Sequence, residues 1–249
     1  MWSRVQLRRF SSSTSRVLAL SLAVLLPAVA IGRQATICDE MDFSKVVNMP
    51  PYEVAFKRPL SRDLCEVILK VKGKYVPVFV GRDFIIGGEL FMDNRNVTLE
   101  RIRGLMRRDF QAVRKDLDGA VAFAYAPPGS VRSVYLFTDP KCPFCERAKK
   151  VLKDWADRER VRIKVVFLPL HAGSRGMAVR GICSGMTYQD YLAGRYGGEL
   201  CEAGRARVRK EMALARRLHV NATPTIITDT GERIVGLNLS KLEAAVAKR

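Results

Sequence analysis

Hydrophobic and polar residues after position 130 alternate in two different periods, which predict a strand followed by a helix. The segment 131–139 (VRSVYLFTD) is rich in β-branched and aromatic residues, and Pro140 ends it. We therefore expect a buried strand there. Directly downstream, apolar residues recur at helical spacing, namely Phe144, Ala148, Val151, Leu152 and Trp155. This spacing predicts an amphipathic helix that begins close to residue 142.

The last third of the chain continues this alternation. Residues 161–170 (VRIKVVFLPL) are typical of a strand, and helical stretches follow them. Two short strands over 225–228 and 233–235 then precede a helix that begins at Ser240. The resulting order, βαβ followed by ββα, predicts an α/β fold.

Residues 65–92 show strand patterns without intervening helices. The segments CEVILKV and YVPVFV flank a Lys-Gly-Lys turn, and glycine-containing turns separate two further apolar stretches, FII and ELFM. Pro77 cannot donate a backbone hydrogen bond to a central ladder, so we expect its strand at a sheet edge. Such a sheet is too small to bury a large core alone. Pairing with a second copy through an exposed edge would enlarge the core, which predicts a homodimer.

A charged helix is predicted between these two halves. Thr98 is the expected N-cap, and Glu100 lies in the first turn. A single apolar stripe follows at helical spacing: Leu99, Ile102, Met106, Phe110, Val113 and Leu117. The segment 126–129 (APPG) then interrupts the chain before the next strand. We expect this helix to connect the two halves.

The N-terminus has the pattern of a secretory signal peptide. Four arginines and no acidic residue precede an apolar run from Val17 to Ala30, and the last three residues of that run offer a small-residue cleavage site. Export with cleavage near Ala30 is therefore expected. The run contains Pro27 and is shorter than the ~20 residues of a typical membrane span. An uncleaved membrane anchor is the alternative.

The chain is strongly basic, with a formal net charge of +18 at pH 7. This charge falls to +14 if the four arginines of the predicted signal are removed. Such a value is typical of nucleic-acid binding, but an exported protein seldom meets nucleic acid, so no nucleic-acid partner is expected. Arginines of the segment 205–217 share a predicted helix with an apolar stripe. A solvated helix face, which can attract acidic client chains, explains them.

The tetrapeptide Cys142-Pro143-Phe144-Cys145 stands where the predicted strand gives way to the predicted helix. This places Cys142 at the N-cap and Pro143 at the first helical position, where its missing N–H is not needed. The free N–H groups and partial positive charge of a helix N-terminus favour a thiolate. Lowering a thiol pKa from about 8.5 to about 6 requires only about 3.4 kcal/mol. We expect Cys142 to be the attacking nucleophile and Cys145, one turn later, the resolving thiol.

Two other interpretations of this CxxC motif compete with a redox pair. Half of a zinc site would need two more ligands at suitable spacing, and the sequence has no second closely spaced Cys/His pair. A purely structural disulfide would close a very short loop, which removes little entropy from the unfolded chain. A redox-active pair is therefore favoured, and its chemistry needs no metal and no organic cofactor.

The chain contains six cysteines, and this even number fits an oxidising compartment. With the redox pair set aside, the remaining four allow three connectivities. Sequence proximity favours Cys183 with Cys201, a structural staple worth about 3 kcal/mol, and Cys38 with Cys65. Cys38 lies close to the predicted new N-terminus, so it can also stay free or bridge to another chain.

The segment 221–225 (NATPT) directly precedes the late strand pair. An X-Pro bond is trans by default, but the distant CxxC motif favours a cis bond before Pro224. The preceding backbone would then lie against the reactive sulfurs, where it can pair with an extended client chain. Thr223 and Pro224 are therefore expected to bind substrate, together with Pro143 and Phe144 between the cysteines.

The chain resembles the thioredoxin superfamily, and more closely the bacterial periplasmic disulfide isomerases of the DsbC/DsbG family. The resemblance is carried by LFTDPKCPFCERAKK, GICSG, ELCEAG and NATPTIIT in that order, and more weakly by KGKYVPVFVGRDFIIGGELFMD. By position, it implies that the CxxC cysteines are the redox pair, that Thr223 and Pro224 form the cis-proline loop, and that Cys183 and Cys201 form a structural disulfide. It also implies a periplasmic homodimer with facing active sites, and a membrane thiol reductant that keeps the CxxC reduced.

The same resemblance implies a division of the chain. A signal peptide over 1–30 would precede an N-terminal dimerisation domain over 31–95, a linker helix and hinge over 96–128, and a thioredoxin-fold catalytic domain over 129–249. The expected fold class is thus α/β in the catalytic domain, with a small β-rich N-terminal domain.

The expected activity is isomerisation or reduction of incorrect disulfides in unfolded or misoxidised exported proteins. DsbC-like members carry Gly-Tyr between the two cysteines, whereas the Pro143-Phe144 pair is closer to the Pro-Tyr of DsbG-like members. The balance between a broad isomerase and a narrower reductase or chaperone therefore stays open. A dithiol oxidase with the same residues and a dimeric holdase chaperone are the rival expectations.

Overall fold

The computed structural model describes residues 35–40 and 50–247. The predicted signal peptide and its cleavage position near Ala30 therefore lie outside the described residues, as does the segment 41–49. Within the described residues, none of the helices combines the length and the hydrophobicity needed to span a bilayer.

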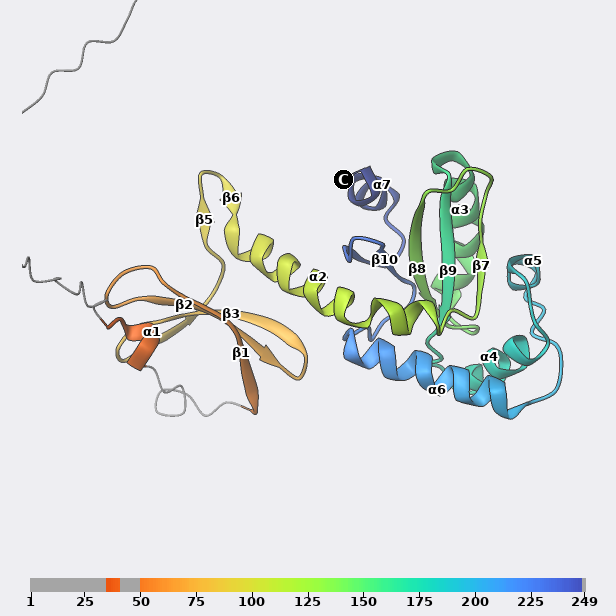
Figure 1. Cartoon of the computed structure of the whole chain (residues 1–249), viewed down its shortest axis with the longest axis horizontal. Coiled ribbons are helices and arrows are strands. Elements are labelled where there is room, and N and C mark those ends of the chain that lie inside the picture. Colours follow the sequence, from red (N-terminus) through yellow and green to blue (C-terminus); the bar gives the residue numbers. More distant parts are fainter. Residues whose placement is uncertain (1–34, 41–49, 248–249) are drawn as a thin grey trace, which may run out of the picture. The chain divides into compact units, whose positions relative to one another are not determined.

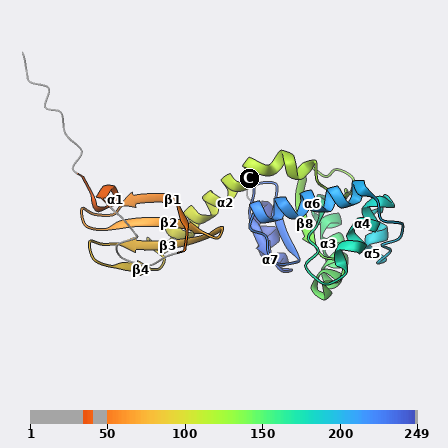
Figure 2. The same ribbon diagram turned by 90° about the horizontal axis from the view of Figure 1, so that it is seen from below.

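The N-terminal part is a four-stranded antiparallel sheet in the order β1-β2-β3-β4 (Figure 2). Its elements are α1 (Ile37–Glu40), β1 (Tyr52–Pro59), β2 (Cys65–Val71), β3 (Lys74–Val80) and β4 (Ile85–Gly87), followed by the hairpin of β5 (Phe91–Met92) and β6 (Arg95–Asn96). A small buried cluster forms its core: Cys38, Cys65, Val67, Leu69, Val78 and Val80. The β pattern predicted over 65–92 is confirmed.

Pro77 does not lie in an edge strand, so that prediction is wrong. Its strand, β3, stands between β2 and β4. The carbonyl of Pro77 accepts a hydrogen bond from Gly88 N at 3.4 Å, on the side of β4, and its nitrogen faces the same side. There β4 pairs with β3 over Val78–Val80 only. The missing N–H of Pro77 therefore leaves the ladder between β2 and β3 intact.

The edge strand β1 was not predicted from the sequence. Its side chains are mostly exposed or half-buried, and it contains Lys57, Arg58 and Pro59. A shift of register between Val54 and Phe56 also breaks the two-residue alternation that identifies a strand. β1 therefore forms because it pairs with the apolar strand β2, although its own sequence has no strand pattern.

The predicted connecting helix is present as α2 (Val97–Asp118), but its N-cap is Asn96 rather than Thr98. The Asn96 side chain accepts a hydrogen bond from Leu99 N at 2.8 Å. Thr98 is fully buried inside the first turn, where its hydroxyl donates to Glu66 Oε1 at 3.1 Å. Asn and Thr are both common N-caps, and burial of Thr98 against Glu66 decides between them.

The C-terminal part is a five-stranded sheet in the order β11-β10-β8-β9-β7, in which only β8 and β9 are parallel (Figure 1). Its strands are β7 (Phe123–Tyr125), β8 (Arg132–Thr138), β9 (Val161–Phe167), β10 (Thr225–Thr228) and β11 (Arg233–Val235). Its helices are α3 (Pro143–Glu159), α4 (Ser174–Cys183), α5 (Tyr188–Leu192), α6 (Glu202–Arg217) and α7 (Leu239–Ala247). The βαβ and ββα order predicted from the sequence is confirmed, and β7 is an additional edge strand.

Both faces of this sheet are covered, because alternate residues of β8 enter two different cores. Val134 and Leu136 pack in one core, beneath α3 and α7. Tyr135 and Phe137 pack in the other, against α2 and α6. Each large side chain buried in this way contributes about 1.5–3 kcal/mol. The central strand is therefore fixed on both faces, and its C-terminal end at Thr138 is a rigid support for the loop that follows.

Candidate active site

The two CxxC cysteines lie at the start of helix α3, directly after the loop that follows β8. Cys142 is the N-cap of α3 in an extended conformation, and Pro143 is the first helical residue, as the sequence predicts. Cys145 lies on the inner side of the first turn. Both thiols are free, and only 4% of Cys142 and 3% of Cys145 is exposed.

Cys142 has a depressed pKa, although its burial opposes ionisation. Hydrogen bonds to the Thr223 side chain and to the backbone N–H groups of Cys145 and Phe144 outweigh that burial and lower the pKa below the ordinary thiol value. While protonated, the sulfur donates to the Thr223 carbonyl oxygen, at 3.4 Å.

Cys145 has the opposite character. Burial raises the pKa of its thiol above the ordinary value, and hydrogen bonds from the Thr138 side chain and the Asp139 backbone only partly compensate. One sulfur of the pair is therefore suited to attack, and the other is held protonated until it is needed.

The segment predicted to face the sulfurs does so. The Thr223–Pro224 peptide bond is cis, and the contact of Thr223 with Cys142 joins positions 81 residues apart in the sequence. The Pro224 carbonyl accepts from Gly236 N at 2.8 Å, and the Thr225 hydroxyl donates to the Ala222 carbonyl at 2.7 Å. These bonds fix the loop opposite the helix N-terminus.

Asp139 is a site residue that sequence reasoning missed. Its buried carboxylate accepts hydrogen bonds from Lys141 N at 2.8 Å and from His171 N at 2.8 Å, and it pairs with His171 Nδ1 at 2.9 Å. Leu170 N and both His171 nitrogens contact Oδ2, whereas Lys141 N donates to Oδ1. The Ser174 hydroxyl, 3.3 Å from Oδ2, donates to the His171 carbonyl at 2.6 Å. Burial raises its pKa, but these hydrogen bonds outweigh burial and lower it. Asp139 therefore joins the loop before Cys142 to the loop after β9. An acidic residue directly after a buried strand was the only available signal.

A second unforeseen group lies behind Cys145. The hydroxyls of Thr138 and Tyr191 are 2.7 Å apart, and both residues are buried. Lys149, also buried, donates to the Tyr191 carbonyl at 3.0 Å and pairs with Glu146 at 2.6 Å. Tyr191 and Lys149 lie in helical segments, and nothing in the sequence pattern of those segments indicates that the two residues belong to the site.

A groove of about 360 Å³ is lined by residues next to the pair, from the first turn of α3, the cis-proline loop and the end of β11. It is lined by Phe144, Arg147, Thr223, Pro224, Val235, Gly236 and Leu237. The Arg147 guanidinium lies over the Phe144 ring at 4.6 Å, which is a favourable cation–π geometry. Phe144 is 62% exposed, and Val235 and Leu237 are exposed as well. Apolar side chains therefore remain accessible beside the reactive sulfur.

The other four cysteines form two disulfides at a distance from this pair in the sequence. Cys183, at the end of α4, is bonded to Cys201, the N-cap of α6. Cys38 is bonded to Cys65 in the N-terminal core. These are the pairings that sequence proximity favours.

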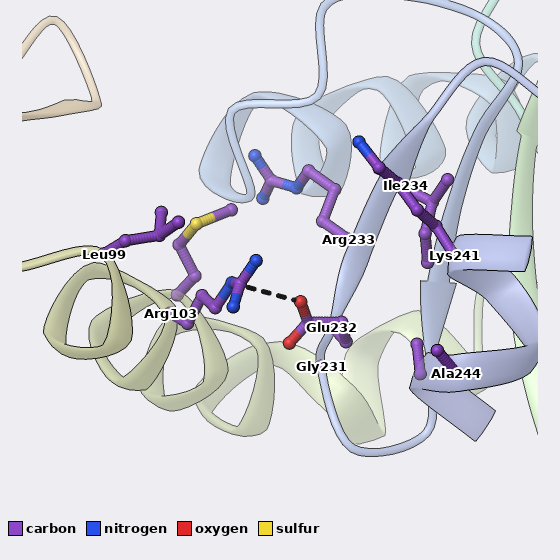
Figure 3. A pocket seen from close by; sticks show the side chains of 10 residues that line it. Leu99, Arg103, Gly231, Glu232, Arg233, Ile234, Lys241 and Ala244 are labelled. Carbon is purple, nitrogen blue, oxygen red and sulfur yellow. Dashed lines mark ion pairs between the residues drawn. The ribbon is translucent and has the colours of Figure 1, made fainter. Parts of the chain in front are cut away.

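A larger pocket, of about 370 Å³, lies elsewhere and contains neither redox cysteine. Figure 3 shows it between α2 and the β10–β11 turn, where Arg103 pairs with Glu232 at 3.4 Å and Lys241 enters from α7. Its walls combine apolar side chains with three basic residues and Glu232. It contains no cysteine and is not the site of the thiol chemistry.

The fold and the paired thiols define a class, that of the thioredoxin-like thiol–disulfide oxidoreductases. Residues 120–247 match the family described as the thioredoxin-like domain, and the chain belongs to that family. No curated protein matches the sequence.

Several solved structures are similar at low identity. The catalytic domain of Proteus mirabilis ScsC is 16% identical, with 56% of this chain and 96% of that chain covered and a TM-score of 0.45. The thiol-disulfide exchange protein alpha-DsbA2 from Wolbachia pipientis is 15% identical, with 58% and 95% covered and a TM-score of 0.47. Helicobacter pylori DsbG is 18% identical, with 71% and 93% covered and a TM-score of 0.38.

Proposed function

We propose that this protein is a periplasmic thiol–disulfide interchange protein of the DsbC/DsbG type, which isomerises or reduces incorrect disulfides in exported proteins. The supporting observation is the arrangement of Cys142, whose pKa is lowered at a helix N-terminus and whose sulfur touches the backbone before a cis-proline. A nucleophilic sulfur thus lies next to a backbone segment that can pair with a client.

The reaction begins with the Cys142 thiolate attacking one sulfur of a client disulfide. A bond forms between Cys142 Sγ and that sulfur, the client S–S bond breaks, and the second client sulfur leaves as a thiolate. If a client thiolate then attacks the mixed disulfide, Cys142 leaves unchanged and the client is isomerised. If Cys145 attacks Cys142 instead, the client leaves reduced and the CxxC pair is oxidised by two electrons. A membrane thiol reductant would restore the dithiol.

The groove beside the pair suits an extended, partly apolar client segment. Phe144, Val235 and Leu237 offer exposed apolar surface, and Arg147 adds a positive charge at its border. β11 is an edge strand of the sheet, and an edge strand can accept an added strand. Thr223 and Pro224, with Pro143 and Phe144, would form the client-binding surface.

The homodimer belongs to the same proposal. The N-terminal sheet ends in the edge strands β1 and β4, and several of its apolar side chains are exposed, among them Val54, Val76 and Ile86. A second copy that pairs with one of these edge strands would cover such residues. The same proposal divides the chain into a signal peptide over 1–30, which rests on its charge and apolar pattern, a dimerisation domain over 31–95, a linker over 96–128 and a catalytic domain over 129–249. The end of that linker contributes β7 to the catalytic sheet. Sedimentation at micromolar concentration tests the homodimer, and a pure monomer would contradict it.

Refolding of scrambled ribonuclease tests the activity. The wild-type protein should restore ribonuclease activity, and Cys142→Ser should abolish that effect. Cys145→Ser is the matched control, because it keeps the nucleophile and should retain isomerisation while accumulating mixed disulfide. Unchanged refolding activity in Cys142→Ser would refute the assignment.

A holdase chaperone is a second candidate, favoured by the exposed apolar residues of the groove and of the N-terminal sheet. Suppression of client aggregation should then survive replacement of both Cys142 and Cys145 by serine. A dithiol oxidase would use the same residues, and a strongly oxidising reduction potential of the pair, combined with monomeric behaviour, would favour it over the isomerase.

A further inference from the structure

The groove next to the redox pair contains a single charged side chain. Of the described residues that line it, only Arg147 is charged. None of the described carboxylates forms an ion pair with Arg147, whose exposed side chain contacts the Phe144 ring instead. An exposed guanidinium that has no partner of opposite charge is available to a carboxylate of a bound molecule.

The Phe144 ring determines where this charge lies. The guanidinium carbon of Arg147 lies over the ring, 4.6 Å from its centre, and the two residues are three positions apart on one face of α3. A guanidinium over a ring gains a cation–π attraction, and its planar fork of N–H groups can still bind a carboxylate. Phe144 is 62% exposed. The ring and the guanidinium therefore form one accessible surface that is both apolar and positively charged.

The distance from the reactive sulfur to this charge fits a short stretch of extended client. Thr223 lines the groove, and its carbonyl oxygen is 3.4 Å from Cys142 Sγ. Arg147 follows Cys142 by five positions on α3, which is an axial rise of about 7.5 Å. An extended chain advances about 3.3 Å per residue and places alternate side chains on one side. A side chain two positions from the attacked client cysteine, about 6.6 Å away, can therefore reach Arg147.

We propose that Arg147 is a specificity-determining residue, which selects client segments with an acidic residue two positions from the cysteine that Cys142 attacks. The inference rests on the proposed function, because it concerns formation of the mixed disulfide. The client carboxylate would pair with the guanidinium, and apolar neighbours in the client would pack on Phe144, Val235 and Leu237. The pair holds the client in place. The bond changes stay the same: a bond forms between Cys142 and the client sulfur, and the second sulfur of the broken S–S bond leaves as a thiolate.

A direct ion pair has to be separated from general attraction. The chain as a whole has a formal net charge of +18, so it attracts any acidic peptide at long range. Salt screens that attraction beyond about 8 Å at about 0.15 M ionic strength. The pair with Arg147 depends on the position of the acidic residue relative to the cysteine, whereas the general attraction does not. The position of the acidic residue in the client therefore distinguishes the two effects.

The test measures how fast the full chain, with its CxxC pair reduced, attacks alanine-rich peptides whose single cysteine is linked to thionitrobenzoate. Release of coloured thionitrobenzoate reports the attack. The peptides carry one glutamate two positions before or two positions after the cysteine, and glutamine at the same position in the reference. At about 0.15 M salt, at least one glutamate peptide should react roughly fivefold faster than its reference, the factor expected for two unit charges in contact in a solvated site.

Two peptide controls accompany this measurement. Attack of the same peptides by glutathione gives the intrinsic ratio of the two rates, by which the ratio for the protein is divided. A peptide with its glutamate six positions from the cysteine, about 20 Å away, keeps the charge but cannot reach Arg147 while its cysteine is attacked. Its corrected ratio should be close to one.

Variants of the protein assign the preference to one side chain. Arg147→Gln should bring the corrected ratio close to one, and Arg147→Glu should reverse the preference in favour of a lysine peptide. Arg158→Gln is the matched control, because Arg158 is also exposed on α3 but lies in its last turn. It removes the same charge and should keep the preference.

A corrected ratio close to one in the wild type would overturn the specificity role of Arg147. So would a preference that survives in Arg147→Gln, or an equal loss of preference in Arg158→Gln. A wild-type protein that attacks none of the peptides faster than glutathione does would instead overturn the proposed function, and the specificity role with it.

Discussion

The sulfur of Cys142 lies 3.4 Å from the carbonyl oxygen of Thr223, a residue 81 positions later in the chain. The contact joins the N-terminus of α3 to the loop before β10, and the pairing of β8 with β10 brings these segments together. The reactivity of the thiol therefore depends on the sheet as a whole.

Alkylation of Cys142 should be faster near neutral pH than alkylation of free cysteine. Its lowered pKa enlarges the thiolate fraction at pH 7. The rate of iodoacetamide reaction, measured against pH in Cys145→Ser, should have its midpoint below the ordinary value of about 8.5. The same variant unfolded in urea is the control and should return to the ordinary value. Identical midpoints in the two states would contradict the depressed pKa.

The same pKa shift predicts how stability depends on pH. Because the folded-state pKa of Cys142 is the lower one, the thiolate stabilises the reduced protein above the unfolded-state pKa, and this contribution is lost as pH falls through the folded-state value. The double variant Cys142→Ser, Cys145→Ser lacks it. The difference in the free energy of unfolding between Cys145→Ser and this double variant should therefore shrink with falling pH in urea titrations. A difference in the free energy of unfolding that stays constant with pH would contradict a lowered pKa of Cys142 in the folded state.

Asp139→Asn should destabilise the protein at neutral pH. Its Oδ2 atom accepts from the backbone N–H groups of Leu170 and His171, and Oδ1 accepts from Lys141 N, so either orientation of an amide there would place its NH2 group against an N–H donor. A loss of about 1–3 kcal/mol in the free energy of unfolding is expected. The lowered pKa of Asp139 stabilises the protein above the unfolded-state value and is lost as pH falls through the folded-state value. The variant should therefore show a weaker loss of stability in acid, and an unchanged acid profile would refute this.

Glu211 should make the protein less stable as pH rises. It is fully buried on α6, where Oε1 accepts from Phe167 N at 3.2 Å and Oε2 has no partner among the described residues. Burial raises its pKa well above the ordinary value. The folded state thus holds a proton that the unfolded state releases above about pH 4.3, and stability declines from there up to the folded-state pKa.

Glu211→Gln removes this titration and keeps an acceptor for Phe167 N. Its free energy of unfolding should therefore vary less with pH than that of the wild type. Glu211→Leu is the contrasting variant, because it leaves the Phe167 N–H unpaired and should cost about 1–3 kcal/mol. Parallel pH curves for wild type and Glu211→Gln would show that the carboxyl does not titrate as described.

Removal of the Cys183–Cys201 disulfide should lower stability without abolishing thiol reactivity. The bond closes a loop with a sequence separation of 18, which is worth about 3 kcal/mol in the chain-entropy model. The double alanine variant should show that loss in urea denaturation, while Cys142 keeps its alkylation rate in the native state. A loss of Cys142 reactivity in the folded variant would instead couple this disulfide to the site.

The elements with a clear hydrophobic pattern of their own could be predicted from the sequence. The strands that form only by pairing with an apolar neighbour could not. The strands 225–228 and 233–235 appear with the bounds expected for them, because short β-branched runs between turn residues carry their own signal. β1 and β7 were missed, since each is an edge strand whose pairing with an apolar neighbour supplies its order.

The residues of the candidate site also fall into those that the sequence predicts and those that it does not. The place of Cys142 and Pro143 at the start of α3 could be read from the chain, because helix N-termini have local rules. The places of Asp139, Thr138 and Tyr191 could not be read from the chain, since they arise from contacts between residues 32 and 53 positions apart. Spacing in the sequence contains no information about which buried polar groups meet.

Helix α2 shows that the limits of a family match and of a folding unit can differ. The match begins at residue 120, yet Phe110, Val113 and Leu117 precede it and form part of the core beneath Tyr135 and Phe137. The Phe110 and Tyr135 rings lie 5.6 Å apart, edge to face. A truncated protein cut at residue 120 would keep α6 on this face of the central strand but would expose the apolar surface that Phe110, Val113 and Leu117 cover. We therefore expect a fragment that starts before α2 to aggregate less than one that starts at residue 120.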